Sequence, residues 1–204
     1  MKTKEKILKE SLRVFNENLF ELSTTNMIAN ESKILEGSLW YHFNSKIDIV
    51  SSHLDMFIDL FNMQKKHTKD NNPTIFIQGL FSAYEIIWDF RYLFRDSFQK
   101  ISKQKPILFE RIIDTNNLLD QWIEESIIHA RNTGILIIDE SDVDNIVEVS
   151  LIIGRYWFDF SKKRYSSETS VFLRKKGINL LIKNFHPHLS EESKELIDSI
   201  YELN

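Results

Sequence analysis

The sequence predicts an all-α protein of about ten helices. Apolar residues recur every three or four positions along nearly the whole chain, which is the period of an amphipathic helix. Only five Gly and three Pro interrupt the 204 residues. The one β-like run, residues 135–138, is too short to found a sheet.

The composition is that of a globular protein with a buried core, because hydrophobic residues make up 42% and charged residues 27% of the chain. No apolar run approaches the roughly 20 residues that a membrane span needs. Lys6, Lys9 and Glu10 interrupt any signal-peptide core near the N-terminus. The absence of Cys excludes disulfides and thiolate metal sites. We therefore expect a cytoplasmic protein with no membrane association.

The first 50 residues predict three helices and the start of a fourth. One apolar stripe from Ile7 to Leu19 marks the first helix. Thr24 or Thr25 is expected to cap a short second helix, and a third runs from about residue 35 to 41. Ser45, with Asp48 three residues on, gives a capping-box-like start to a long fourth helix.

The rest of the chain predicts six further helices. Pro73 opens one in a favourable first-turn position, and Gly134 closes another. Capping residues are expected at Ser141 or Asp142, at Ser166 or Ser167, and at Ser190. The expected ranges are about 73–92, 95–101, 107–131, 142–163, 168–185 and 190 onward.

Charge alone does not indicate a nucleic-acid-binding protein. Residues 1–50 carry seven Lys/Arg and seven Asp/Glu, so the net charge of −4 lies on the remainder. A neutral N-terminal segment is the less acidic part of the chain, but it is not a basic patch.

Two short helices separated by a tight turn, and braced by a longer helix before them, have the dimensions of a helix-turn-helix. The segment resembles the DNA-binding domain of TetR-family transcriptional regulators, whose pattern it matches without gaps. The matching positions are Thr24, Ile28-Ala29, Ile34, Gly37-Ser38-Leu39, Tyr41-His42-Phe43 and Ser45-Lys46. The resemblance covers about residues 1–50 and implies a three-helix DNA-binding domain there.

Three positions depart from the family pattern. Lys33 stands at the turn glycine, so this residue must adopt a strained conformation or a different turn. Leu35-Glu36 replaces a pair that is commonly small and polar or basic, and Trp40 replaces the usual Tyr. The general role therefore carries over from the family, but its base preferences do not.

The predicted DNA contacts combine this resemblance with side-chain chemistry. A Thr hydroxyl at a helix start and the Lys46 ammonium suit phosphate, whereas Glu36 can accept from cytosine N4. Ile28, Leu39 and Phe43 are expected to be core. The predicted DNA-binding residues are Thr24, Thr25, Leu35, Glu36, Gly37, Ser38, Trp40, Tyr41, His42 and Lys46.

Residues 51–204 fit the family's second domain, which dimerises and holds a small-molecule effector. The two dense apolar stripes near the C-terminus predict a four-helix bundle between two subunits. The predicted interface residues are Val149, Ile153, Tyr156, Trp157, Phe172, Ile178, Leu181, Ile182 and Phe185. Packing of the same residues within one subunit is the alternative.

An aromatic-rich body would allow a largely apolar effector pocket. The candidate lining residues are Phe57, Phe61, Phe81, Tyr84, Trp88, Phe98, Phe109 and Trp122. The same rings would equally fill an ordinary core.

We therefore expect a homodimeric, ligand-responsive repressor that binds a palindromic double-stranded DNA operator. Effector binding is expected to change the spacing of the two DNA-binding domains through the fourth helix. The alternative is a helical protein–protein adaptor that has lost sequence-specific DNA binding. No enzymatic motif occurs, and His186-Pro187-His188 is expected to be a surface turn, so we expect no catalysis, cofactor or metal.

Overall fold

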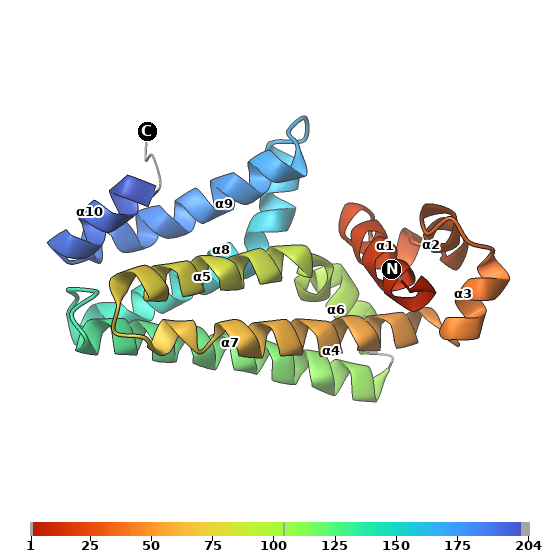
Figure 1. Cartoon of the computed structure of the whole chain (residues 1–204), viewed down its shortest axis with the longest axis horizontal. Coiled ribbons are helices and arrows are strands. Elements are labelled where there is room, and N and C mark those ends of the chain that lie inside the picture. Colours follow the sequence, from red (N-terminus) through yellow and green to blue (C-terminus); the bar gives the residue numbers. More distant parts are fainter. Residues whose placement is uncertain (1, 104, 201–204) are drawn as a thin grey trace. The chain divides into compact units, whose positions relative to one another are not determined.

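The structure is a computed structural model that describes residues 2–103 and 105–200. These residues form ten α-helices and five short 3-10 helices (Figure 1). The α-helices are α1 (Thr3–Glu17), α2 (Thr25–Glu31), α3 (Glu36–His42), α4 (Lys46–Gln64), α5 (Pro73–Asp89), α6 (Asp96–Ser102), α7 (Pro106–Asn132), α8 (Val143–Arg164), α9 (Ser170–Phe185) and α10 (Glu191–Ile200). The 3-10 helices are η1 (Phe20–Leu22), η2 (His67–Lys69), η3 (Arg91–Phe94), η4 (Glu140–Asp142) and η5 (His186–His188). The predicted all-α class is confirmed.

Local sequence rules account for most helix boundaries. Thr24 caps α2 by accepting from the Met27 N–H, and the Ser45 hydroxyl accepts from the Asp48 N–H at the start of α4. The first helix ends at Glu17, so Leu19 lies outside it. The cap expected at Ser166 or Ser167 is wrong, because Thr169 is the N-cap of α9 and accepts from the Phe172 N–H.

The β-like run at residues 135–138 forms a single antiparallel bridge rather than a strand. Leu136 pairs with Leu189, and the Ile137 N–H donates to the His188 carbonyl. Gly134, with φ of 75°, turns the chain between α7 and this run. A two-residue pairing satisfies the local backbone groups without requiring a sheet.

Internal packing divides the chain into two compact units. The first unit runs to Leu60 and includes Asp89–Thr115, and the second comprises Phe61–Trp88 and the residues from Asn116 onward. Helices α4 and α7 each contribute residues to both units.

The core of the first unit is an aromatic cluster. The Phe15 ring lies 5.0 Å from Phe20 and 5.1 Å from Tyr92, and Phe98 packs edge-on against Phe20 at 5.0 Å. Edge-to-face contacts of this kind add to the hydrophobic gain of burial. The cluster joins α1, η1, η3 and α6 into one body.

A buried polar network lies beside these rings. His53 of α4 contacts the Leu8 carbonyl through Nε2 at 3.0 Å and the Tyr92 hydroxyl through Nδ1 at 2.8 Å. Because a carbonyl only accepts, Nε2 carries the proton and Nδ1 accepts from Tyr92. Burial lowers the pKa of His53 to about 4, although the Leu8 carbonyl partly opposes this effect. The neutral imidazole therefore links α1, α4 and η3.

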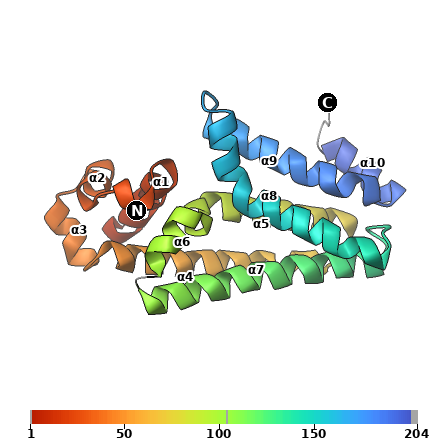
Figure 2. The same cartoon turned by 180° about the vertical axis from the view of Figure 1, so that it is seen from behind.

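The second unit is built around the packing of α8 against α9, which follow one another through a short turn (Figure 2). The Trp157 indole N–H donates to the Leu173 carbonyl at 2.8 Å, and the Asn184 amide donates to the Ser150 hydroxyl at 3.2 Å. Gly177 allows α9 to approach Tyr84 and Trp157 closely.

Among the residues that the structure describes, no helix combines the length and apolarity required to cross a bilayer.

Candidate nucleic-acid interface and effector cavity

The turn between α2 and α3 is a Schellman motif centred on Lys33. The Ile34 N–H donates to the Ala29 carbonyl at 3.0 Å, and the Lys33 N–H donates to the Asn30 carbonyl at 2.9 Å. This pattern requires a left-handed residue, and Lys33 has φ of 51°. The first alternative predicted for this position, a strained conformation, is therefore confirmed, because the turn keeps the geometry that normally favours glycine.

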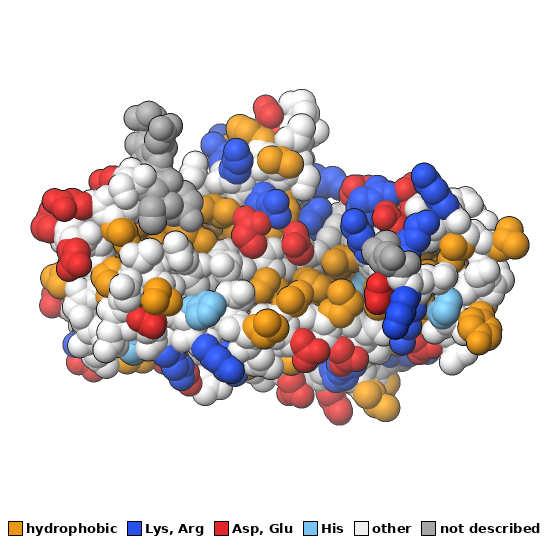
Figure 3. Space-filling model, in the orientation of Figure 1, with side chains coloured by type: hydrophobic (Ala, Val, Ile, Leu, Met, Phe, Trp, Pro, Cys, Tyr) orange, Lys and Arg blue, Asp and Glu red, His pale blue; other side chains and the backbone are white. Residues whose placement is uncertain are grey.

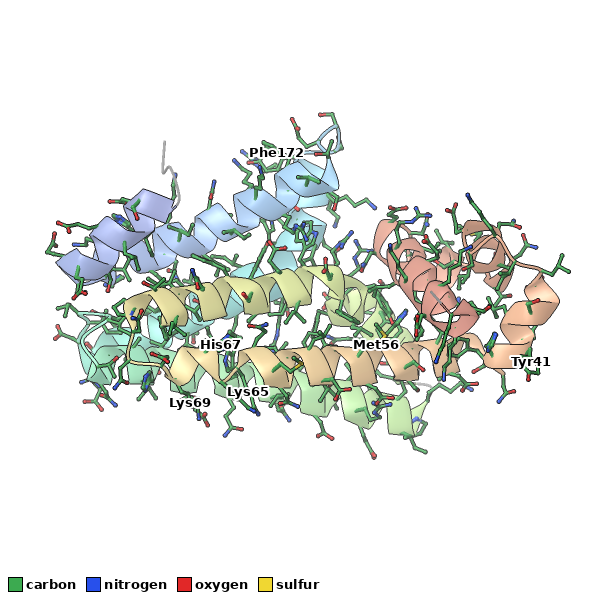
Figure 4. All side chains as sticks on the ribbon, viewed as in Figure 1. Tyr41, Met56, Lys65, His67, Lys69 and Phe172 are labelled. Carbon is green, nitrogen blue, oxygen red and sulfur yellow. The ribbon has the colours of Figure 1, made fainter. Side chains whose placement is uncertain are left out.

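Helix α3 is anchored by one side and exposes the other. Leu39 and Phe43 are buried in the first unit, as predicted. Leu35 is 80% exposed and Tyr41 is 86% exposed, with Tyr41 projecting outward from the helix (Figure 4). Gly37, Ser38 and Trp40 are also exposed, and the half-buried His42 ring contacts Tyr41 edge-on at 5.2 Å. These residues form an exposed surface on one side of α3.

Two predicted DNA contacts bind one another instead. The Thr25 hydroxyl donates to Glu36 Oε1 at 2.5 Å, across the turn from α2 to α3. Its proton is therefore used within the chain, which revises the expected phosphate contact of Thr25. Thr24 keeps a free hydroxyl proton because its oxygen serves as the acceptor of the α2 cap. Glu36 retains its second carboxylate oxygen as an acceptor.

Lys46 also has partners within the chain, contrary to the expectation of an external anion. Its ammonium donates to the Phe20 carbonyl at 2.8 Å and the Ser23 carbonyl at 2.7 Å, and it lies 4.1 Å from the Phe20 ring centroid. Burial lowers the pKa of Lys46, and the nearby Glu21 carboxylate partly opposes this. We therefore assign Lys46 to bracing η1 against α4 and remove it from the predicted phosphate contacts.

Lysines of α1 were missed as candidate phosphate contacts. The Lys4 ammonium lies 5.5 Å from the ring centroid of Phe43, which follows the last residue of α3. Lys and Arg side chains lie over α1 (Figure 3). The available signal was the run of Lys2, Lys4, Lys6 and Lys9, but only the fold shows that the start of α1 meets the end of α3.

The second unit contains an apolar cavity of about 50 Å³ between α5, α7, α8 and α9. Three of the predicted pocket residues, Phe81, Tyr84 and Trp122, line it. Its walls are otherwise mainly aliphatic, and examples are Leu119, Ile123, Leu151 and Leu181. It holds only a few water molecules, whereas ligand sites typically measure about 300–1,000 Å³. A larger ligand therefore requires movement of these helices or side chains.

The other five predicted pocket residues do not line this cavity. Phe57 and Phe98 pack with other rings of the first unit, at 5.3 Å from Phe94 and 5.3 Å from Tyr92 respectively. Phe61 packs edge-on against Trp122, and Trp88 against Phe158. Phe109 lies near the Lys103 ammonium. These rings fill cores or the surface, which was the alternative that the sequence left open.

The predicted dimer face is partly buried within its own subunit. Trp157, Leu181, Ile182 and Phe185 are buried, and Leu181 and Phe185 line the apolar cavity, so these four predictions are wrong. Ile153 and Ile178 are half-buried. The exposed members are Val149 and Tyr156 of α8 and Phe172 of α9. Phe172 lies near the start of α9 (Figure 4). Ile152 and Phe160 extend the exposed stripe, of which Phe160 was missed.

The sequence model of the TetR family, described as "Bacterial transcriptional repressor", matches residues 59–197. The chain therefore belongs to the TetR family. It is 31% identical over 133 residues to the HTH-type transcriptional repressor KstR2 of Mycobacterium tuberculosis, and the match covers 58% of this chain and 66% of KstR2. The chain thus spans just under two thirds of the length of this relative.

Solved structures support the same fold. A TetR-family regulator from Marinobacter aquaeolei has a TM-score of 0.74 and 24% identity, and the match covers 99% of this chain and 98% of that one. The ketosteroid transcriptional regulator KstR2 of Mycobacterium tuberculosis has a TM-score of 0.65 and 21% identity, with 93% and 96% covered. SmeT in complex with triclosan has a TM-score of 0.60 and 13% identity, with 94% and 93% covered.

Proposed function

We propose that the chain is a cytoplasmic, DNA-binding repressor that works as a homodimer and releases its operator on binding a small molecule. Residues 1–50 would bind DNA and residues 51–204 would hold the effector and the dimer interface. The match to the family of bacterial transcriptional repressors supports this function over that of an adaptor, and it gives no reason to expect an enzyme.

The exposed side of α3 carries the proposal. Leu35 at the N-cap of α3 and Ser38 and Tyr41 within it are exposed at three-residue spacing, whereas Leu39 and Phe43 are buried and hold the helix. A short helix anchored in this way can enter the major groove, and two copies related by a two-fold axis would contact half-sites about 34–36 Å apart. Thr24 and Lys4 flank this surface as phosphate contacts.

Gly37 is a second feature that favours DNA binding. A Cβ at this position would meet no atom of the chain within 4 Å, so packing does not explain the glycine. Gly within a helix costs about 1 kcal/mol relative to Ala. We propose that the missing side chain lets a base or phosphate approach the backbone closely.

The exposed stripe of α8 is proposed as the dimer interface. Val149, Ile152, Tyr156 and Phe160 lie on one side of the helix, with Phe172 at the start of α9. A large apolar surface of this kind on a regulatory domain fits a second copy, because a four-helix bundle would bury it. SmeT is described in complex with triclosan, and KstR2 is described as a ketosteroid regulator. These two descriptions support an effector that is largely apolar.

Retardation of a palindromic fragment from upstream of the protein's own gene tests the DNA-binding proposal. Gly37→Ala should raise the melting temperature yet weaken binding, because the methyl adds helix propensity while obstructing the DNA. Ser38→Ala and Tyr41→Ala should each weaken binding about tenfold. Lys4→Ala should weaken binding to all DNA sequences about equally, and it should reduce the slope of log affinity against log salt concentration by about 1.

Ile137→Ala is the matched control, because Ile137 is exposed in the loop before α8. It should leave retardation unchanged. Sequence-independent binding, or retardation unaffected by the Gly37, Ser38 and Tyr41 variants, would contradict the proposed interface. For the dimer, Tyr156→Asp should give monomers in sedimentation velocity, whereas Ile137→Asp should not.

A further inference from the structure

An open groove of about 890 Å³ lies in the second unit between α5 and α9, with Ser199 of α10 at its edge. This volume is within the range of about 300–1,000 Å³ that is typical of small-molecule sites. Its lining is apolar at Phe81, Val171 and Ile178 and is otherwise charged or polar. Lys, Arg, Asp and Glu side chains lie next to each other over this part of the molecule (Figure 3).

The groove adjoins the apolar cavity described above. Phe81 lines both spaces, and its side chain is almost completely buried. The cavity lining is mostly apolar, and its polar members Ser150 and Arg155 already bind Asn184 and Asp120, so it suits a hydrocarbon better than a charged end of a ligand. Rotation of the Phe81 ring would join an apolar chamber to a polar entrance.

The charges at this entrance favour an anion. Arg174 Nη1 binds Glu85 Oε2 at 2.8 Å across the groove, and the exposed Lys175 follows on the same helix. Two cations thus face one carboxylate, and the other lining residues are uncharged. Because Arg174 already binds a carboxylate here, its position suits a second carboxylate that takes the place of Glu85.

We propose that this groove is the entry and head-group site for an organic carboxylate with an apolar body. The ligand carboxylate exchanges with Glu85 at Arg174 and gains Lys175 as a second cation. The apolar body displaces Phe81 and extends into the cavity. This inference rests on the proposed function, since it names the chemical class of the effector.

Exchange at Arg174 would also loosen a link between α5 and α9. The Arg174–Glu85 ion pair and the close contact of Gly177 with Tyr84 both hold these two helices together. Entry of the apolar body past Phe81 separates the same two helices. The ligand therefore acts on the packing of the second unit rather than on the charge of the DNA-binding surface.

Decanoate and decan-1-ol are suitable probes, because they share an apolar body and differ in the head group. Binding is measured by isothermal titration calorimetry with the full chain below the critical micelle concentration. We expect decanoate to bind at least fivefold more tightly than decan-1-ol. Lys175→Gln should abolish most of that preference, and Glu85→Gln should raise decanoate affinity severalfold by removing the competing carboxylate.

Lys176→Gln is the matched control, because Lys176 has the same charge on the same helix but lies near the rings of Tyr165 and Phe172 instead. It should leave both affinities unchanged. The inference is overturned if decan-1-ol binds as tightly as decanoate, if neither binds, or if Lys175→Gln and Lys176→Gln have equal effects. Operator retardation without the probe tests the proposed function independently, so retardation without decanoate binding refutes this inference alone.

Discussion

Gly154 and Gly177 lie in the interiors of α8 and α9, yet a methyl group added to each would meet different surroundings. At Gly154 no atom lies within 4 Å of the new Cβ, because this residue lines the apolar cavity. At Gly177 the new Cβ would lie 1.9 Å from the Tyr84 hydroxyl oxygen and 2.7 Å from Trp157 Cδ1. The two glycines form a matched test of packing in the second unit.

The expected magnitudes have opposite signs. Gly154→Ala should stabilise the fold by about 1–2 kcal/mol, from about 1 in helix propensity and up to 0.8 from the buried methyl. Gly177→Ala gains the same propensity but overpacks the contact with Tyr84, and displacement of Trp157 would break its hydrogen bond to Leu173. Overpacking and a lost buried hydrogen bond each cost about 1–3 kcal/mol, so we expect a net loss of about 2–3 kcal/mol.

Urea unfolding at one fixed protein concentration measures both changes, because the proposed dimerisation would make apparent stability depend on concentration. Removing the hydroxyl with Tyr84→Phe in the Gly177→Ala background should recover part of the loss, since it eliminates the closest contact. A Gly177→Ala protein as stable as the wild type would refute the packing described for α5, α8 and α9. Equal effects at the two glycines would refute it as well.

Three further predictions concern the first unit. The pKa of His53 is lowered to about 4, so the unfolded chain binds a proton at this residue before the folded chain does as the pH falls below about 6.5, and the stability of the fold should drop by about 3 kcal/mol by pH 4. The stability of His53→Gln in chemical unfolding should therefore depend less on pH. A pH dependence identical to that of the wild type would contradict the assigned network. Lys33→Gly should stabilise the fold by about 0.5–1 kcal/mol in urea unfolding by relieving the left-handed backbone, whereas Lys33→Ala should give no such gain. Lys46→Met should destabilise the fold by about 1 kcal/mol, because it removes the donors to two carbonyls. If the variant instead kept its stability and reduced the salt dependence of DNA binding, Lys46 would again be assigned as a phosphate contact.

The helix-turn-helix region could be predicted in detail because its geometry follows from local rules and from the resemblance to the family pattern. The cap expected at Thr24 or Thr25 and the capping serine at residue 45 depend on residues within a few positions of one another. The strained backbone at Lys33 was one of two alternatives that the resemblance to the family implied. The helix-turn-helix resemblance also predicted that Leu39 and Phe43 would be buried, because a short helix must be held rigidly by its neighbours. What it could not predict was the pairing of Thr25 with Glu36 or the carbonyl partners of Lys46, since these join separate elements.

The pocket and the dimer face were harder to predict because helical periodicity indicates that a residue is buried, but not against what. Phe57 and Phe81 belong to equally apolar helix faces, yet one packs in an aromatic core and the other lines the cavity. Along α8, Tyr156 and Trp157 are adjacent in sequence, but only Tyr156 is exposed. The apolar residues of α8 form a band wide enough to include both a side that packs within the chain and a side that stays exposed. Only the placement of α9 determines which residues belong to each side.

This division bears on how an effector could act. Leu181 and Phe185 of α9 line the apolar cavity, while Phe172 of the same helix belongs to the exposed face proposed for the dimer. A ligand that enlarges a cavity of about 50 Å³ must displace some of its walls, because packed interiors do not stretch continuously. Movement of α9 would then change the dimer face directly. The spacing of the two proposed DNA-binding surfaces in a dimer would then depend on the cavity, because α9 contributes residues both to the cavity and to the proposed dimer face.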